Sequence, residues 1–224
     1  MTQMNLWETR SSSLKHLESD LKVEAEVINE AFQILDDCIN HFSSAVHSSS
    51  FLQVCGLTVV KARHLALGCY SLSLDGLGQE AGALVRPLIE TFELLLYFQE
   101  DPKRCEQAFD GTLPSAGEIG KQIQGKFQRM RNHLNVSASH FSFNDYSVQH
   151  LIDWHGVAFK TSQRGSEPTL RRNLATLFTF LIILSAQATN CLYDAKIITD
   201  GSLQKRIDEC RTKGLSLFRP ILGS

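Results

Sequence analysis

The polar segment 129–140 has the residue types and spacing that a chemical site would need. It joins the end of a predicted helix to a serine-rich turn and contains His140. Imidazole changes its charge near neutral pH without special tuning, which makes His140 the candidate titratable group. The alternative is structural: Asn135, Ser137 and Ser139 would cap the helix and turn the chain while the histidines hydrogen-bond locally. The sequence leaves both interpretations open.

A second candidate group is the charged pair Arg86 and Glu90, set one helical turn apart within the apolar segment 84–91. Buried charges must be paired, so this spacing predicts an ion pair that ties the helix to its neighbours. The alternative is that Arg86 addresses an anionic ligand or substrate.

The sequence gives little support for a nucleotide-binding site, a metal site or a catalytic nucleophile. Residues 76–81 have the spacing of a dinucleotide-binding glycine loop, but that loop links a β-strand to a helix, whereas here a helix precedes it. Asp37 and His41 lie one turn apart, as two metal ligands could, yet no further ligand follows at useful spacing. The sequence has neither a nucleophile elbow nor a catalytic-cysteine signature. We therefore expect no cofactor and no metal site.

Composition indicates a folded globular protein. Of its 224 residues, 43% are apolar and 21% are charged, which suits one large domain with a real core. The formal charge of −2 excludes binding to nucleic acid by bulk charge, so any such binding must come from a local patch. The six scattered cysteines include no C-x-x-C pair, and we interpret them as small core residues in a reducing compartment.

Hydrophobic periodicity predicts an all-α, single-domain helical bundle of about seven helices. No segment of the sequence predicts a β-strand of any length. Pro87 should bend or restart its helix, because proline has no N–H to donate to the carbonyl of Ala83. The expected helices span approximately residues 14–46, 51–74, 79–100, 115–135, 146–154, 169–195 and 203–216.

The predicted organisation is a polar N-terminal arm (1–13), the bundle (14–217) and a C-terminal tail (218–224). Segment 174–193 is uncharged and about as long as a bilayer span. Its several hydroxyl and amide side chains favour a helix buried at the centre of a soluble bundle. The N-terminus lacks the apolar stretch of a secretory signal. We therefore expect a cytoplasmic protein with no membrane span.

Taken together, the two polar groups resemble a family of largely uncharacterised prokaryotic helical proteins. In that family a helix bearing R-x-x-x-E precedes a helix that ends in S-x-x-H, and the matching residues here are Arg86 with Glu90 and Ser137 with His140. The resemblance covers residues 32–184. The family is similar in turn to the HEPN group of helical proteins, many of which are metal-independent ribonucleases in toxin and antiphage systems. The resemblance to this group implies a HEPN-like fold and a site formed where two protomers meet.

The HEPN resemblance also implies chemical roles. Histidine would move a proton of the ribose 2′-hydroxyl or of the leaving oxygen, and arginine would stabilise charge on the phosphate. The catalytic candidates are then Arg131 and His140, with Asn132 beside them. This chain departs from the group's signature, because eight residues separate Arg131 from His140 where the signature has four to six. The fitting spacing, from Arg10 to His16, falls near the polar N-terminal arm, outside the expected site.

Two functions remain open. The first is a HEPN-like protein of a stress or antiphage-defence system, such as a toxin–antitoxin pair, that cleaves or binds RNA as a homodimer. Arg86 and Glu90 would support its site. The second is a non-catalytic module that dimerises or binds a partner protein, with the same polar residues in structural roles. A modest basic region near the serine-histidine turn favours the first, although a solvated helix face explains its charges nearly as well. The region consists of Arg129 and Arg131, with Lys121 and Lys126 upstream.

Overall fold

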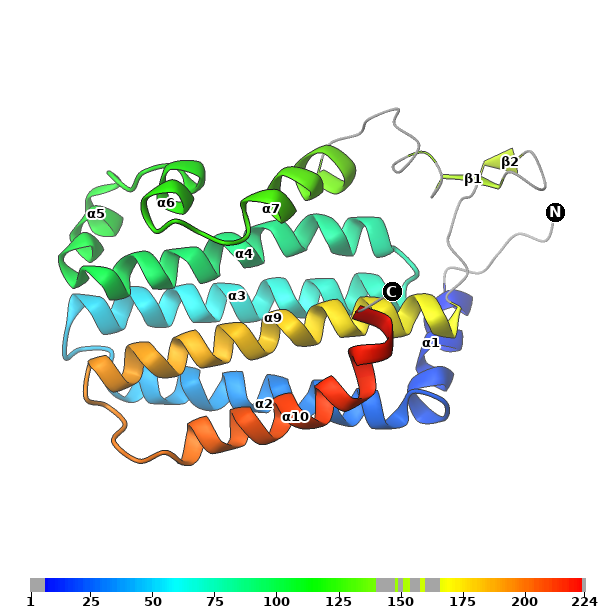
Figure 1. Cartoon of the computed structure of the whole chain (residues 1–224), viewed down its shortest axis with the longest axis horizontal. Helices are drawn as coiled ribbons and strands as arrows, with labels where there is room; N and C mark the ends of the chain where they lie inside the picture. The colour runs from blue at the N-terminus through cyan, green and yellow to red at the C-terminus, as the bar shows by residue number, and fades with distance from the viewer. Residues whose placement is uncertain (1–6, 140–147, 149–150, 154–157, 160–165, 223–224) are drawn as a thin grey trace.

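Four long helices lie side by side and bury the largest side chains between them (Figure 1). The computed structural model describes residues 7–139, 148, 151–153, 158–159 and 166–222. Within these residues the chain is an all-α domain with nine α-helices. The long helices are α2 (Lys22–Ser44), α3 (Ser50–Leu74), α4 (Gly78–Glu100) and α9 (Glu167–Asp194), and α10 (Ser202–Leu222) packs on α2 and α9.

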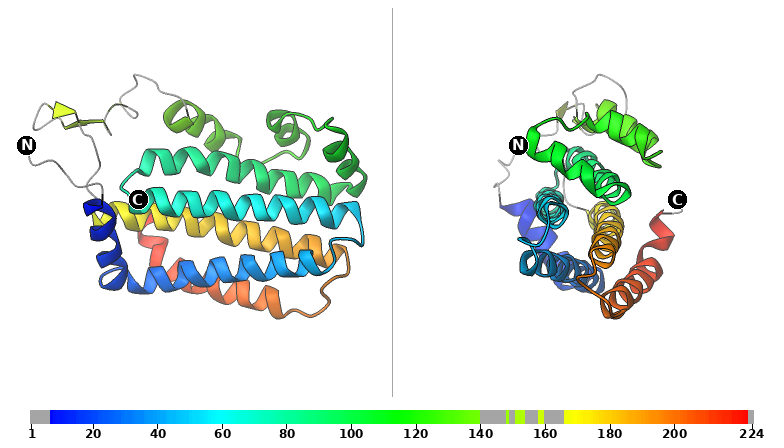
Figure 2. Two further views of the ribbon diagram at one scale, coloured as in Figure 1. Left: turned by 180° about the vertical axis from the view of Figure 1, so that it is seen from behind. Right: turned by 90° about the vertical axis from the view of Figure 1, so that its left-hand side faces the viewer.

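Helix α9 is the central element of the bundle. It contacts α2, α3, α4 and α10, and the end-on view in Figure 2 shows it between α4 and α10. Its inward face is a run of apolar residues at helical spacing that includes Leu170, Leu174, Leu177, Leu181, Leu184 and Ala188. Among the described residues α9 is the helix long and apolar enough to cross a membrane, and 72% of its most apolar window is buried inside the protein. A soluble core helix has the same properties, so the cytoplasmic location stays a prediction.

Three short helices follow α4 and cover part of it: α5 (Cys105–Asp110), α6 (Ala116–Gln122) and α7 (Gln128–Leu134). A 3₁₀ turn (Pro102–Arg104) precedes α5, and a π-helical turn (Asn135–Ser139) continues α7. The expected single helix 115–135 is therefore wrong. The chain breaks after α6 because Gln124 adopts a left-handed backbone with φ of 50° and Gly125 follows it.

The first expected helix is also divided. A break at residues 19–21 separates α1 (Glu8–Glu18) from α2, and residues 8–13, expected in a loose arm, are helical. Helix α1 packs through the buried residues Thr9, Ser13 and Leu17. Arg10 reaches across to the end of α3, where its guanidinium donates to both carboxylate oxygens of Asp75 at 2.6 Å. Arg10 therefore has a structural role.

The expectations for α3, α4 and α9 agree with the structure to within three residues at either end. Helix α4 runs through Pro87 as one helix, which excludes the restart that was one of the two expectations, and the bend stays a prediction. Helix α10 extends to Leu222, beyond the expected end at residue 216 and into the expected tail. The expected helix 146–154 lies mostly outside the described residues. Of its described part, Ile152–Asp153 (β1) pairs antiparallel with Ala158–Phe159 (β2).

All six cysteines are buried as free thiols. Cys38 in α2 illustrates their environment, because burial raises the pKa of its thiol to about 12. Thiols in such surroundings behave as small apolar side chains, since the reactive thiolate is suppressed. The prediction that they are core residues is confirmed.

Candidate functional site

Helix α4 presents a row of charged side chains to the short helices that cover it. Arg86, Glu90 and Glu93 follow one another at spacings of four and three residues, which places them on one face of the helix. The partners of this row come from α7 and the π-helical turn that continues it. The two groups that the sequence singled out are therefore brought together along one seam, which we call the α4–α7 seam.

Arg86 holds the π-helical turn in place. Its Nε donates to Oε1 of Glu90 at 3.1 Å, and its Nη1 donates to Oδ1 of Asn135 at 2.7 Å. Asn135 is the first residue of the π-helical turn, so the contact ties that turn to the middle of α4. The predicted ion pair between Arg86 and Glu90 is confirmed. Both side chains remain partly exposed, so the pair by itself contributes at most about 1 kcal/mol.

Arg131 makes a different contact, with a residue that the sequence did not single out. Its Nη1 lies 2.9 Å from Oε2 of Glu93, and the side chains are only 6% and 1% exposed. The same Nη1 donates to the carbonyl of Ala116 at 2.8 Å, while Nη2 donates to Gln128 at 2.5 Å. Both terminal nitrogens of the guanidinium are thus engaged by protein groups between α4, α6 and α7, while its buried Nε has no hydrogen-bond partner among the described residues.

Burial dominates the electrostatics of Glu93. It raises the pKa of this carboxyl above its ordinary value, Arg131 opposes that shift, and Glu90 adds to it. The ion pair is out of line for a hydrogen bond, and no described residue donates an aligned one to either carboxylate oxygen. Removing one partner of such a pair is strongly unfavourable, because the other charge is left buried and alone.

Two glycines give the buried pair its space. A Cβ at Gly120 would run into the guanidinium of Arg131, and a Cβ at Gly125 would run into the carboxylate of Glu93. Gly120 lies within α6, and Gly125 lies in the break between α6 and α7. The break therefore has a packing reason: the chain must pass close to α4 over two buried charges.

A sequence signal for Glu93 exists, although our interpretation did not use it. Glu93 is an acidic residue inside the most apolar part of α4, seven residues after Arg86 on the same face. Such an acid needs a basic partner when it is buried. Its partner could not be chosen from the sequence, because several arginines and lysines follow within forty residues.

The remaining predicted site residues lie on or beyond the seam. Asn132 is exposed on α7, where its Oδ1 accepts from Gln128 at 2.9 Å. The backbone of Ser137 belongs to the π-helical turn, while its side chain and all of His140 lie outside the described residues. The structure thus joins Arg86 and Glu90 to the Ser137 turn, and it separates Arg131 from solvent.

Next to the seam is a cavity of about 300 Å³, which we call the α4–α9 cavity. Its walls come from the first turns of α4 and α9, from α7 and the turn after it, and from the end of α3. The polar lining residues are Ser73, Gln79, His133, Thr169, Arg172, Asn173 and Thr176. Val85, Met130, Leu134 and Leu177 contribute an apolar part of the lining.

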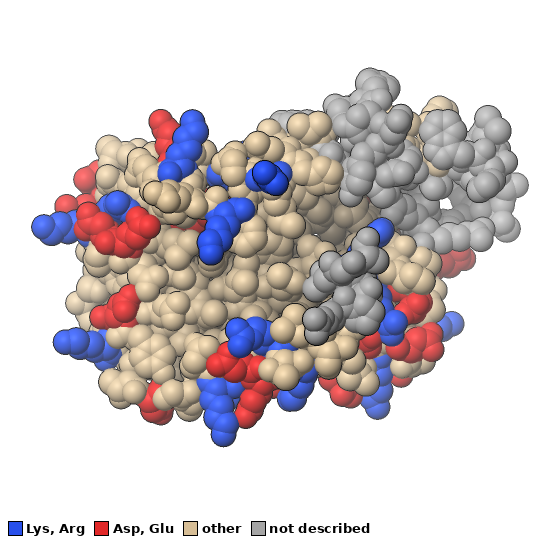
Figure 3. All heavy atoms as spheres, in the orientation of Figure 1, with Lys and Arg blue, Asp and Glu red and all other residues tan. Residues whose placement is uncertain are grey.

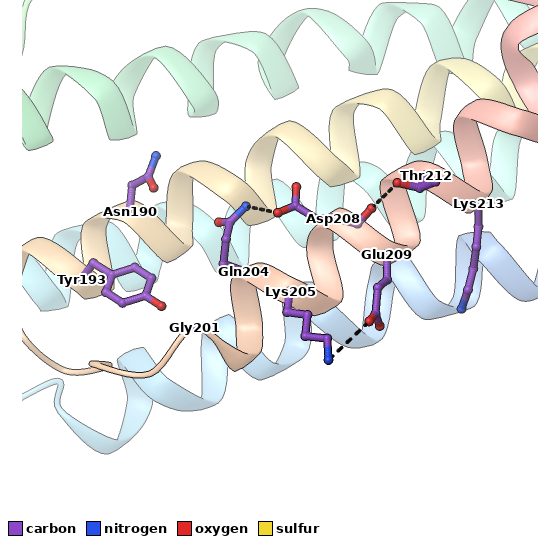
Figure 4. Close-up of a pocket in the computed structure, with 9 residues that line it drawn as sticks. All are labelled: Asn190, Tyr193, Gly201, Gln204, Lys205, Asp208, Glu209, Thr212 and Lys213. Carbon is purple, nitrogen blue, oxygen red and sulfur yellow. Dashed lines mark hydrogen bonds and ion pairs between the residues drawn. The ribbon is translucent and has the colours of Figure 1, made fainter.

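A larger hollow of about 1030 Å³ lies on the surface between α9 and α10 (Figure 4). Its charged side chains are engaged with one another or with nearby helices: Lys205 pairs with Glu209, and Lys213 pairs with Glu30. Gln204 donates to Asp208 within the same helix. This open hollow is a solvated helix face, whereas the smaller α4–α9 cavity is more enclosed.

Among the residues that the structure describes, no three His, Cys, Asp or Glu side chains are grouped so that they could hold a metal ion. Comparison with protein-family models, with curated protein sequences and with solved structures finds no match. The chemistry of the chain is therefore judged from the α4–α7 seam and the α4–α9 cavity themselves.

Proposed function

We propose that this chain is a non-catalytic helical module that pairs with a second copy of itself. One observation carries the proposal: Arg131, the arginine that RNA cleavage would require, is buried against Glu93. A transition-state phosphate needs a guanidinium within hydrogen-bond reach of its oxygens. The guanidinium of Arg131 serves the packing of α7 on α4 instead, which supports the structural interpretation of the polar residues.

The surface of α9 supports pairing with a second copy. Its partly exposed residues from 173 to 193 carry no charge and form one stripe, the α9 stripe, made of Asn173, Thr176, Thr179, Ile183, Ala186, Asn190 and Tyr193. At 1.5 Å per residue the stripe is about 30 Å long. Figure 3 shows a broad uncharged area in the middle of the face that α9 crosses in Figure 1, with charged side chains gathered around its margins.

A two-fold dimer uses the same patch on both subunits, so the patch must be compatible with itself. The middle of the stripe meets this condition, because bringing two copies together there creates no like-charge contact. Its end at Asn190 and Tyr193 borders the charged side chains of the α9–α10 hollow. Its small side chains at Thr176, Thr179 and Ala186 also permit close approach of two helices. The α9 stripe is therefore the face on which we propose that two protomers meet.

The test is the oligomeric state of a charge-inserted variant. Thr179→Glu places a carboxylate in the middle of the α9 stripe, and in a symmetric dimer it places two of them close together. Gln53→Glu adds the same charge at an exposed position of α3 and is the matched control. In sedimentation equilibrium we expect dimers for the wild type and Gln53→Glu and monomers for Thr179→Glu. A monomeric wild type at high micromolar concentration would refute the proposal.

A second candidate function, RNA-directed activity of a HEPN-like defence protein, is favoured by the π-helical turn. Such turns occur often at functional sites, and this one holds Ser137 and leads directly to His140. Arg86 fixes the start of the turn through Asn135. In this alternative His140 would be the acid or base, and an arginine other than the buried Arg131 would contact the phosphate.

Cleavage of a broad RNA panel in EDTA separates the two functions. The HEPN-like alternative expects cleavage by the wild type and its loss in His140→Ala. The non-catalytic proposal expects intact RNA with the wild type and with His140→Ala. It also expects His140→Ala, in which Thr179 is unchanged, to keep the oligomeric state of the wild type. Metal-independent cleavage that disappears in His140→Ala would establish the alternative.

A further inference from the structure

The α4–α9 cavity contains the ingredients of an anion-binding site. Among the described residues of its lining Arg172 is a permanently charged side chain, and none of these residues is an Asp or a Glu. Its neighbour Arg171 is engaged, with Nη2 at 2.8 Å from Glu24 and Nε at 3.2 Å from Glu167. For Arg172 the described part of the chain offers no ion pair. Of these two consecutive arginines, Arg171 is thus paired within the fold, whereas Arg172 lines the cavity.

The walls beside Arg172 supply groups that can bind the rest of an anionic head group. Asn173 contributes an amide and Thr169 contributes a hydroxyl group, whereas the hydroxyl of Thr176 already donates to the backbone carbonyl of Arg172 at 3.2 Å. His133 lies on the α7 side of the cavity. Hydrogen-bonding groups beside an arginine are a usual composition of a carboxylate or phosphate site.

Other parts of the lining are apolar. Val85 and Leu177 are buried in the bundle, while Leu134 and Met130 approach from α7. A volume of about 300 Å³ is at the lower end of the range for small-molecule sites. The occupant that matches these walls has a short apolar body and one anionic head.

We propose that the α4–α9 cavity binds a small amphiphilic anion, a carboxylate or phosphate monoester with a short aliphatic part, whose head group contacts Arg172. Every described lining residue belongs to one chain, and two of them, Asn173 and Thr176, also belong to the α9 stripe. Binding would connect the first turns of α4 and α9 to α7 and the π-helical turn, and so would stabilise the seam beside it.

The test is calorimetric titration of the full chain with four probes: hexanoate, hexyl phosphate, 1-hexanol and inorganic phosphate. The two amphiphilic anions should bind measurably, and the neutral alcohol and the bare phosphate at least tenfold more weakly. Whichever of hexanoate and hexyl phosphate binds more tightly identifies the head group. Equal binding of 1-hexanol would overturn the proposal, because the cavity would then be only an apolar hole.

Three variants locate the site. Arg172→Gln removes the cation from a surface position and should weaken hexanoate or hexyl phosphate about five- to tenfold, the effect of one charge-assisted contact at a partly exposed site. Thr176→Phe fills the cavity and should abolish binding. Arg129→Gln removes an exposed arginine of α7 that does not line the cavity, and it should bind like the wild type. Equal losses in Arg172→Gln and Arg129→Gln, or no loss in Arg172→Gln, would overturn the proposal.

Discussion

Replacing Arg131 with Met tests the buried charge pair on which the assignment of the α4–α7 seam depends. Methionine keeps much of the volume of the side chain but leaves Glu93, which is 1% exposed, without its cation. Removing one partner of a buried ion pair costs about 3–5 kcal/mol. For a domain of this size the same loss lowers Tm by about 6–20 °C.

The assay is urea unfolding followed by helical circular dichroism. Arg129→Met is the control, since Arg129 is exposed on the same helix and its loss should change the free energy of unfolding by no more than about 0.5 kcal/mol. Adding Glu93→Leu to Arg131→Met should recover part of the lost stability, because the uncompensated charge is gone. A loss below about 1 kcal/mol in Arg131→Met would refute the buried pair.

The pH dependence of the same variant has a definite sign. Burial already raises the pKa of Glu93, and removing Arg131 takes away the group that opposes the shift, so the pKa rises further. A carboxyl whose folded pKa is raised contributes most stability below its unfolded value near 4.5 and loses that contribution as the pH rises through the folded pKa. Arg131→Met should therefore be closer to the wild type at pH 5 than at pH 7.5. The opposite trend would contradict the assignment.

The remaining predictions concern the packing around the seam and the core. Gly125→Ala should lower the free energy of unfolding by about 1–3 kcal/mol, because its Cβ meets the Glu93 carboxylate, whereas Gly117→Ala in open space should be neutral or stabilising by up to about 1 kcal/mol; equal effects in urea unfolding would contradict this. Asn135→Ala removes an acceptor of Arg86 and should cost about 1 kcal/mol in the same assay, and an unchanged midpoint would count against that contact. At pH 8 the native thiols should resist a disulfide reagent and become reactive in urea, since burial raises the pKa of Cys38 to about 12; rapid native labelling of all six would show that the core is open.

The sequence predicted the long helices because each is defined by contacts within a few turns of itself. Periodicity gave α3, α4 and α9 with nearly correct ends, and the uncharged segment 174–193 identified the central helix. The Arg86–Glu90 pair was equally easy to predict, since residues four apart on a helix are neighbours whatever surrounds them. These features are local, so one segment of sequence is enough to specify them.

The breaks in the helices were harder to predict. The apolar stripe of residues 115–135 continues across the boundary between α6 and α7, and nothing local demands a turn at Gln124. The turn is required by the approach of Gly120 and Gly125 to charged groups on other helices. Propensity is a weak preference that tertiary packing overrides.

What the sequence determined by itself is the helical class, the central position of α9 and the charged face of α4. Only the tertiary structure decided that Arg131 is paired with Glu93, thirty-eight residues earlier in the chain, and that Arg172 faces a cavity while Arg171 does not. The physical reason is that burial and partner choice depend on which helices meet. An arginine carries the same charge in either setting, and its surroundings decide whether that charge is used by the fold or offered to a ligand.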